Sequence, residues 1–157
     1  MLDHPDRARR RPAPARPVDN GVDMRIGGAA MTVARPDTFA ALLGVAVHRD
    51  GEGRAEARLT VGPHHLNPHG TAHGAVLYTV GGVALAAAAN DATYSGVVTA
   101  VHVDYVRPAL LGDDLVARAE VAERTDREDL FVVRVTRTGD GALVARLAGR
   151  ATRRRRE

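Results

Sequence analysis

Polar and hydrophobic residues alternate along several stretches of this chain, as they do in strands with one solvent-facing side. The alternation is strict over residues 54–61, and residues 45–49 precede the turn sequence at 51–53, so these two segments are expected to form a hairpin. Four more alternating segments follow, separated by turn residues: 97–107, 115–124, 130–138 and 142–152. The pattern therefore predicts an antiparallel sheet.

Two other segments are expected to be helical. Residues 36–44 have a proline near the start and a glycine at the end, which is typical of a short helix. Residues 74–89 form an uncharged run of 16 residues, too long for a strand and shorter than the roughly 20 residues of a membrane span. A helix without charge must be buried on nearly all sides. We therefore expect an α+β fold in which an antiparallel sheet wraps around one long central helix, with no membrane segment.

Length and composition favour a single domain. Of the 157 residues, 45% are hydrophobic and 26% are charged, which is ordinary for a globular protein. The absence of cysteine excludes disulfides, thiolate metal sites and a thiol nucleophile, and a reducing cytoplasm is the expected location. We expect residues 1–30 to be a disordered leader rich in Arg and Pro, residues 36–152 to be the folded domain, and residues 153–157 to be a basic tail.

Positive charge is concentrated near the two ends of the chain. The formal net charge is +3, and all 22 basic residues are Arg. Residues 1–20 carry +2 and residues 150–157 carry +4, so the body between them carries −3. An acidic body with 3% aromatic residues lacks the basic face and the stacking platform of nucleic-acid-binding proteins. Nucleic-acid binding is therefore not expected, and residues 153–156 are interpreted as a solvated tail.

Two motifs resemble those of a known family. Residues 65–77 read HLNPHGTAHGAVL, and residues 103–108 read VDYVRP and are followed by Gly112-Asp113. In this order and spacing they resemble the PaaI-type acyl-CoA thioesterases, in which an Asn precedes a His-Gly pair that begins an apolar helix. The resemblance extends from about residue 39 to residue 150. It implies the hotdog fold, hydrolysis of an acyl-CoA, and a homodimer or homotetramer with sites between subunits.

The resemblance and the chemistry of thioester hydrolysis indicate three candidate catalytic residues. Negative charge develops on the carbonyl oxygen during hydrolysis, and unpaired N–H groups at a helix N-terminus can stabilise it. Gly74 begins the helix and has no Cβ to keep a carbonyl away from the backbone. His73 can donate to the carbonyl, and the Asn67 amide can orient the carbonyl or a water. Structural roles remain open for all three: close packing for Gly74, helix capping for His73 and a turn for Asn67.

A carboxylate that the family uses is missing. PaaI-type enzymes have an Asp or Glu two turns after the His-Gly pair, and this position is Gly82. In a related branch a Thr follows one turn later, where this chain has Ala86. Two adjacent glycines cost a helix roughly 1 kcal/mol each relative to alanine. Either Gly81 and Gly82 allow close packing, or they enlarge the acyl pocket while the chemistry is weakened or depends on other groups.

Further residues from the loop, the helix and the following strand are expected to bind the substrate: His65, Tyr78, Thr79, Gly82 and Thr99. Core packing remains the alternative for Tyr78 and Thr79. Arg107 and Arg150 are expected to bind the phosphates of coenzyme A, because a guanidinium matches phosphate oxygens. Strict alternation places Thr99 on the strand face opposite His102 and Asp104, and the family resemblance makes Asp104 a solvent-facing residue.

No metal or separate cofactor is expected, because coenzyme A is part of the substrate. His65, His69 and His73 are four residues apart, but Pro68 and Gly70 interrupt any helix that would align them as ligands. Two other functions stay open. One is a hotdog protein that binds an acyl thioester or another small ligand without hydrolysing it. The other is a hotdog enzyme of another reaction type, such as a hydratase, dehydratase or cyclase.

Overall fold

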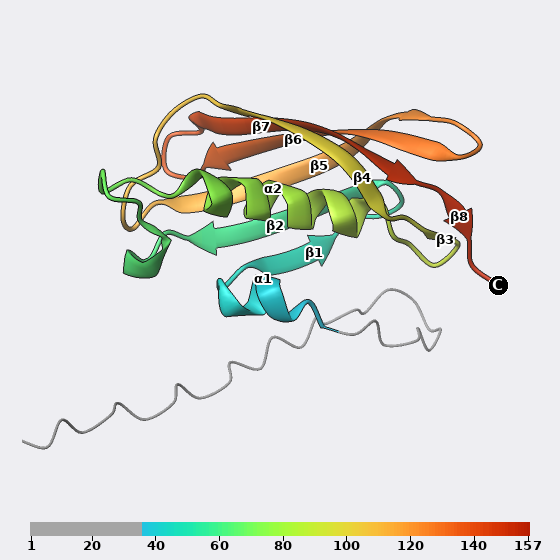
Figure 1. The fold of residues 1–157 in the computed structure, drawn as a ribbon, viewed down its shortest axis with the longest axis horizontal. Coiled ribbons are helices and arrows are strands. Elements are labelled where there is room, and N and C mark those ends of the chain that lie inside the picture. The colour runs from blue at the N-terminus through green and yellow to red at the C-terminus, as the bar shows by residue number, and fades with distance from the viewer. Residues whose placement is uncertain (1–35) are drawn as a thin grey trace, which may run out of the picture.

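One antiparallel sheet with a long helix across one face forms the centre of the molecule (Figure 1). The computed structural model describes residues 36–157, so the predicted leader at residues 1–30 lies outside the described residues. The sheet has six strands in the order β1-β2-β5-β6-β7-β4. Their bounds are β1 (Ala46–Arg49), β2 (Arg54–Thr60), β4 (Val98–Tyr105), β5 (Asp114–Arg124), β6 (Glu128–Arg137) and β7 (Leu143–Thr152). The predicted α+β architecture is confirmed.

The central helix, α2 (Gly74–Ala88), matches the uncharged run in the sequence. Val80, Ala84 and Leu85 are fully buried in the core between α2 and the sheet. Small residues let the two layers approach closely, because a Cβ on Gly81 would lie 2.5 Å from Cδ1 of Leu147 on β7. No helix within residues 36–157 has the length and apolar character needed to cross a membrane.

Long stretches of β2, β6 and β7 bury alternate residues, as the sequence pattern predicted, whereas β5 buries Leu115, Val116 and Ala117 in succession. In β6, Phe131, Val133 and Val135 lie in the core beneath α2, and Arg134 faces the opposite side of the sheet. One irregularity changes an expectation. A β-bulge between Val98 and Ala100 interrupts the pairing of β4 with β7, so the strict alternation that placed Thr99 does not hold there.

The first helix, α1 (Thr38–Leu42), is shorter than the predicted segment 36–44. Asp37 caps it, since its Oδ1 accepts from the N–H groups of Phe39 at 3.1 Å and Ala40 at 2.9 Å. Gly44 follows with a φ of +72°, a left-handed conformation that ends the helix before β1.

Residues 154–156 are exposed, as expected of a solvated tail, but the structure adds a short strand there. β8 (Arg154–Arg155) pairs with β3 (Tyr94–Ser95), beyond the C-terminal end of α2 (Figure 1). The Arg153 guanidinium lies 3.9 Å from the centre of the Tyr94 ring, and Arg156 Nε donates to the Asp91 carbonyl at 3.0 Å. The C-terminal arginines therefore pack against the segment that follows α2 and hold it in place.

Candidate active site

The loop between β2 and α2 closes on itself through Asn67. Its Nδ2 donates to Thr71 Oγ1 at 2.9 Å, while its Oδ1 accepts from the His69 N–H at 2.9 Å and from the Thr71 N–H at 3.3 Å. These bonds span a turn in which Gly70 has a φ of +77°. In this structure the Asn67 amide therefore shapes the loop.

His65 holds the base of the same loop. It lies in the short 3-10 helix η1 (Pro63–His65) and is 2% exposed. Its Nδ1 accepts from the Gly62 N–H at 2.9 Å, and its Nε2 lies 3.1 Å from the Leu43 carbonyl, to which it donates. Burial lowers the pKa of His65, with a smaller effect from the adjacent His64. Both ring nitrogens are thus occupied by backbone groups in this structure, and substrate binding by His65 stays a prediction.

His73 caps the N-terminus of α2. Its Nδ1 accepts from the Ala75 N–H at 3.0 Å, and the residue is exposed. Because Nδ1 is an acceptor, the neutral ring carries its proton on Nε2. His73 therefore presents an N–H donor to solvent at the start of the helix and, while it caps, has no free nitrogen to act as a base.

The amide of Gly74 is the free backbone donor at this point. Within residues 36–157 its N–H has no acceptor, since the first intrahelical bonds begin with the next residues. The Tyr105 hydroxyl donates to the Gly74 carbonyl at 3.0 Å, and a Cβ on Gly74 would lie 3.1 Å from Cζ of that ring. A side chain at position 74 would therefore press on the Tyr105 ring. The His73 Nε2–H and the Gly74 N–H lie on consecutive residues at the positive end of the α2 dipole.

Tyr105 belongs to the site although the sequence analysis did not select it. It ends β4, is 54% exposed, and touches Gly74 across 31 positions of sequence. Its only sequence signal was its place in the VDYVRP motif.

An exposed stripe of α2, formed by Tyr78 and Gly82, leads away from the Gly74 end of the helix. Tyr78 is 41% exposed, and a Cβ on Gly82 would meet only Cε1 of Tyr78, at 3.9 Å. Gly81 packs against the sheet and Gly82 faces open space. Close packing therefore accounts for the glycine at position 81 and does not account for the glycine at position 82. Thr79 is buried and its hydroxyl donates to the Ala75 carbonyl at 2.8 Å, as core packing predicts.

Comparison with known proteins shows which family the chain belongs to. Residues 69–144 match the family model of the thioesterase superfamily. The acyl-coenzyme A thioesterase PaaI of Escherichia coli (strain K12) is 30% identical over 99 residues, which are 63% of this chain and 71% of that protein. The chain belongs to the PaaI-type thioesterases. A putative esterase of Deinococcus radiodurans is 31% identical to this PaaI-type chain over 122 residues, 76% of this chain and 82% of that protein.

Solved structures support the predicted hotdog fold of this PaaI-type chain. The E. coli PaaI protein of the phenylacetic acid degradation operon superposes with a TM-score of 0.71 and 29% identity, covering 75% of this chain and 85% of that one. The TT0310 protein of Thermus thermophilus superposes with a TM-score of 0.70 and 34% identity, covering 74% of this chain and 97% of that one.

The two arginines expected to bind phosphate lie apart in the PaaI-type chain. Arg107 follows Tyr105 at the active-site end, where its Nη1 donates to the Leu143 carbonyl at 3.1 Å. Arg150 lies on the face of the sheet opposite α2, and the Thr99 hydroxyl donates to its carbonyl at 3.3 Å. Neither Arg150 nor Thr99 is brought to the Gly74 end of the helix within the protomer.

Asp104 is paired with two side chains on the face of the sheet opposite α2. Its Oδ2 accepts from Arg146 Nε at 2.7 Å, and its Oδ1 lies 3.0 Å from His102 Nε2. The Arg146 guanidinium, and then His102, lower the pKa of Asp104, which remains ionised on the outer face. No group of three His, Cys, Asp or Glu side chains in residues 36–157 is arranged to hold a metal ion.

Proposed function

We propose that this PaaI-type thioesterase hydrolyses acyl-CoA thioesters at the N-terminus of α2. One observation carries the proposal: the Gly74 amide, which has no acceptor in residues 36–157, follows directly on His73, whose Nε2–H is exposed. Two donors at the positive end of a helix suit the oxygen of a polarised thioester carbonyl.

The reaction needs one water and these two donors. The carbonyl oxygen accepts from Gly74 N–H and His73 Nε2–H, and the water oxygen bonds to the carbonyl carbon. The C–S bond then breaks, the coenzyme A sulfur takes up one proton from the attacking water, and the carboxylic acid is released. A general base contributes about 10² to 10⁴ in rate in other enzymes. Because α2 carries no Asp or Glu, hydrolysis is expected to be slow by this factor.

The acyl group is proposed to lie along the exposed stripe of α2. The Tyr78 ring and the open space above Gly82 offer an apolar surface one to two turns from the Gly74 amide. This surface suits an aromatic or bulky aliphatic acyl group. Arg107, which is exposed at the same end of the molecule, is proposed to contact a phosphate of coenzyme A.

A second copy of the chain is proposed to cover β4. This strand is at the edge of the sheet, and Val98, Val101 and Val103 on it are only partly buried. An exposed edge strand of eight residues with valines along it favours pairing with another strand. A homodimer would cover this edge and the adjoining Tyr105.

The proposed location of the protein is the reducing cytoplasm, because its sequence contains no cysteine.

Gly82 favours a second candidate function, binding of an acyl thioester without hydrolysis. The space above Gly82 can hold an acyl group, whereas nothing on α2 can take a proton from water. The two candidates differ only in whether thiol is released.

Thiol release from a panel of aromatic and aliphatic acyl-CoAs separates them. Ser is a good helix N-cap, so His73→Ser keeps α2 capped and removes the outward N–H. We expect thiol release by the wild type and a loss of about 100-fold in His73→Ser, the usual effect of removing one such donor. The matched control is His69→Ala in the same loop, with activity within about twofold of the wild type. No thiol release, together with thermal stabilisation by the same acyl-CoAs, would reject hydrolysis in favour of binding.

A further inference from the structure

The face of the sheet opposite α2 carries a row of charged residues that crosses five strands. Glu56, Arg118, Arg134, Arg146 and Asp104 are direct register partners on β2, β5, β6, β7 and β4. The three arginines therefore lie side by side on neighbouring strands, about 4.8 Å apart. Like charges directly opposite one another destabilise a sheet. An anion bound over the three guanidinium groups would offset this repulsion.

The two outer arginines of the row pair with carboxylates, of which Glu56 is shared with Arg58, and the central arginine does not. Arg118 Nε lies 2.9 Å from Glu56 Oε2, and Arg146 Nε lies 2.7 Å from Asp104 Oδ2. Arg134 has no ion-pair partner among residues 36–157. The row thus has an unneutralised guanidinium at its centre.

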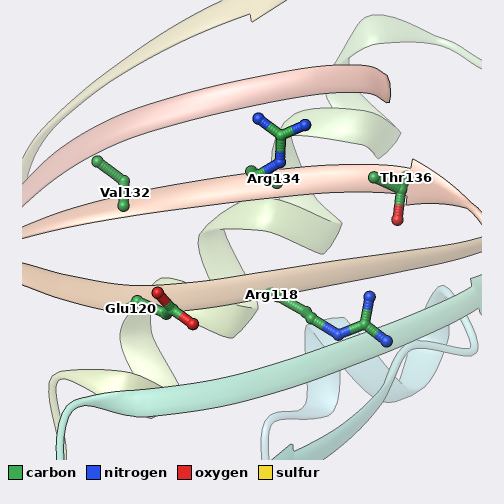
Figure 2. Close-up of a pocket in the computed structure, with 5 residues that line it drawn as sticks. All are labelled: Arg118, Glu120, Val132, Arg134 and Thr136. Atoms are coloured by element: carbon green, nitrogen blue, oxygen red, sulfur yellow. The ribbon is translucent and has the colours of Figure 1, made fainter. Parts of the chain in front are cut away.

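A shallow hollow lies beside this guanidinium. Five residues of β5 and β6 line it: Arg118, Glu120, Val132, Arg134 and Thr136. Figure 2 shows their side chains on the viewer's side of the two strands, with α2 behind the sheet. Arg118 and Arg134 supply two guanidinium forks, which bind phosphate oxygens. The Thr136 hydroxyl donates to the Val116 carbonyl at 3.5 Å. Glu120 is the one carboxylate in the lining.

We propose that this hollow binds a compact oligophosphate anion, the size of a nucleoside di- or triphosphate tail. The distance from Arg118 to Arg146 is two strand spacings, about 10 Å, which suits two or three linked phosphates. The carboxylates of Glu56 and Asp104 lie at the two ends of the row of arginines. An extended polyanion such as RNA would meet these carboxylates. A second copy seated by a two-fold axis over the row would bring Arg134 against its own equivalent.

An apolar floor beside the row supplies room for an organic group. Val132 is 48% exposed in the middle of the sheet, and its register partner is Ala148. A second hollow continues from Val132 over Ala148 toward His102 and Arg150. A flat group such as a nucleobase can lie on these small side chains while its phosphates meet the arginines. The sheet separates this site from Gly74, so the proposal is independent of the hydrolase activity.

Calorimetric titration with ADP and with inorganic tripolyphosphate at about 0.15 M salt tests the proposal. We expect both to bind the full-length wild type, and Arg134→Gln to weaken both at least tenfold. Glu120→Gln removes the opposing carboxylate and is expected to tighten both. Arg127→Gln is the matched control, because it removes the same charge from the exposed turn between β5 and β6. It should change the affinity by less than twofold.

Several results would overturn the site. These are no binding at millimolar ADP and tripolyphosphate, equal weakening in Arg134→Gln and Arg127→Gln, or tighter binding of poly(U) than of tripolyphosphate. Coenzyme A identifies the source of the phosphates. If Arg134→Gln loses binding of both ADP and coenzyme A, the site takes the diphosphate of either ligand. If it loses binding of ADP alone, the site takes a free nucleotide. Thermal denaturation of Arg134→Gln checks the fold, and its Tm should equal or exceed that of the wild type because a repulsion is removed.

Discussion

Gly81 and Gly82 are adjacent in α2, yet the structure predicts opposite responses to the same substitution. A Cβ on Gly81 would lie 2.5 Å from Cδ1 and 2.8 Å from Cδ2 of Leu147. Leu147 is buried in β7 and cannot turn into solvent. A Cβ on Gly82 would meet only Tyr78, at 3.9 Å, an ordinary van der Waals distance.

The magnitudes follow from two opposing effects. Replacing glycine by alanine inside a helix favours folding by about 1 kcal/mol at either position. At Gly82 no clash opposes this gain, so Gly82→Ala should raise the free energy of unfolding by about 1 kcal/mol. Overpacking a core costs about 1 to 3 kcal/mol, so Gly81→Ala should lower it by about 1 kcal/mol. The two variants should therefore differ by about 2 kcal/mol in stability.

Urea denaturation followed by circular dichroism measures this difference, with all proteins at the same concentration. A double variant supplies the control. Leu147→Val shortens the side chain that a Cβ on Gly81 would strike, and it should recover part of the stability lost in Gly81→Ala. Equal stability of Gly81→Ala and Gly82→Ala, or stabilisation by Gly81→Ala, would refute the close contact between α2 and β7.

Three other substitutions test separate parts of the account. Tyr105→Phe removes the hydrogen bond to the Gly74 carbonyl but keeps the ring, so a stability loss of about 1 kcal/mol is expected in the same urea titration, and no loss would count against the bond. Burial lowers the pKa of His65, so the unfolded chain binds this proton more readily and the free energy of unfolding should fall as the pH drops below 6.5. His65→Gln should reduce this dependence of stability on pH. The same dependence in the variant and the wild type would contradict the buried, neutral His65. Gly82→Asp places a carboxylate in open space on α2 and should raise thiol release at least tenfold, and no gain in a folded variant would argue against a family-like site.

The strands and the central helix were predictable because each has a one-sided or uniform burial that the sequence records. Phe131, Val133 and Val135 share the face beneath α2, so the period of two is visible in β6. The uncharged run at 74–89 predicted a buried helix, and the structure has α2 at Gly74–Ala88. Burial against a neighbouring layer is the physical cause of both signals.

The remaining features depend on contacts between distant positions. β3 and β8 have two residues each, too few for a period, and the stacking of Arg153 on Tyr94 joins chain segments far apart in sequence. The motif made His65 a substrate contact, but only the fold shows that the Leu43 carbonyl occupies its Nε2. Tyr105 was overlooked for the same reason, since nothing local indicates that it covers Gly74.

The central claim is that the thioester carbonyl meets the donors at the start of α2, and an infrared measurement tests it without requiring turnover. The ligand is an acyl-CoA analogue in which a methylene replaces the thioester sulfur and the carbonyl carbon is ¹³C. We predict that binding to the wild type moves the carbonyl stretch to lower frequency, because two N–H groups polarise the bond, and that the shift shrinks in the capped variant His73→Ser. A bound analogue whose carbonyl frequency stays at its value in water, or shifts equally in His73→Ser, would contradict the account.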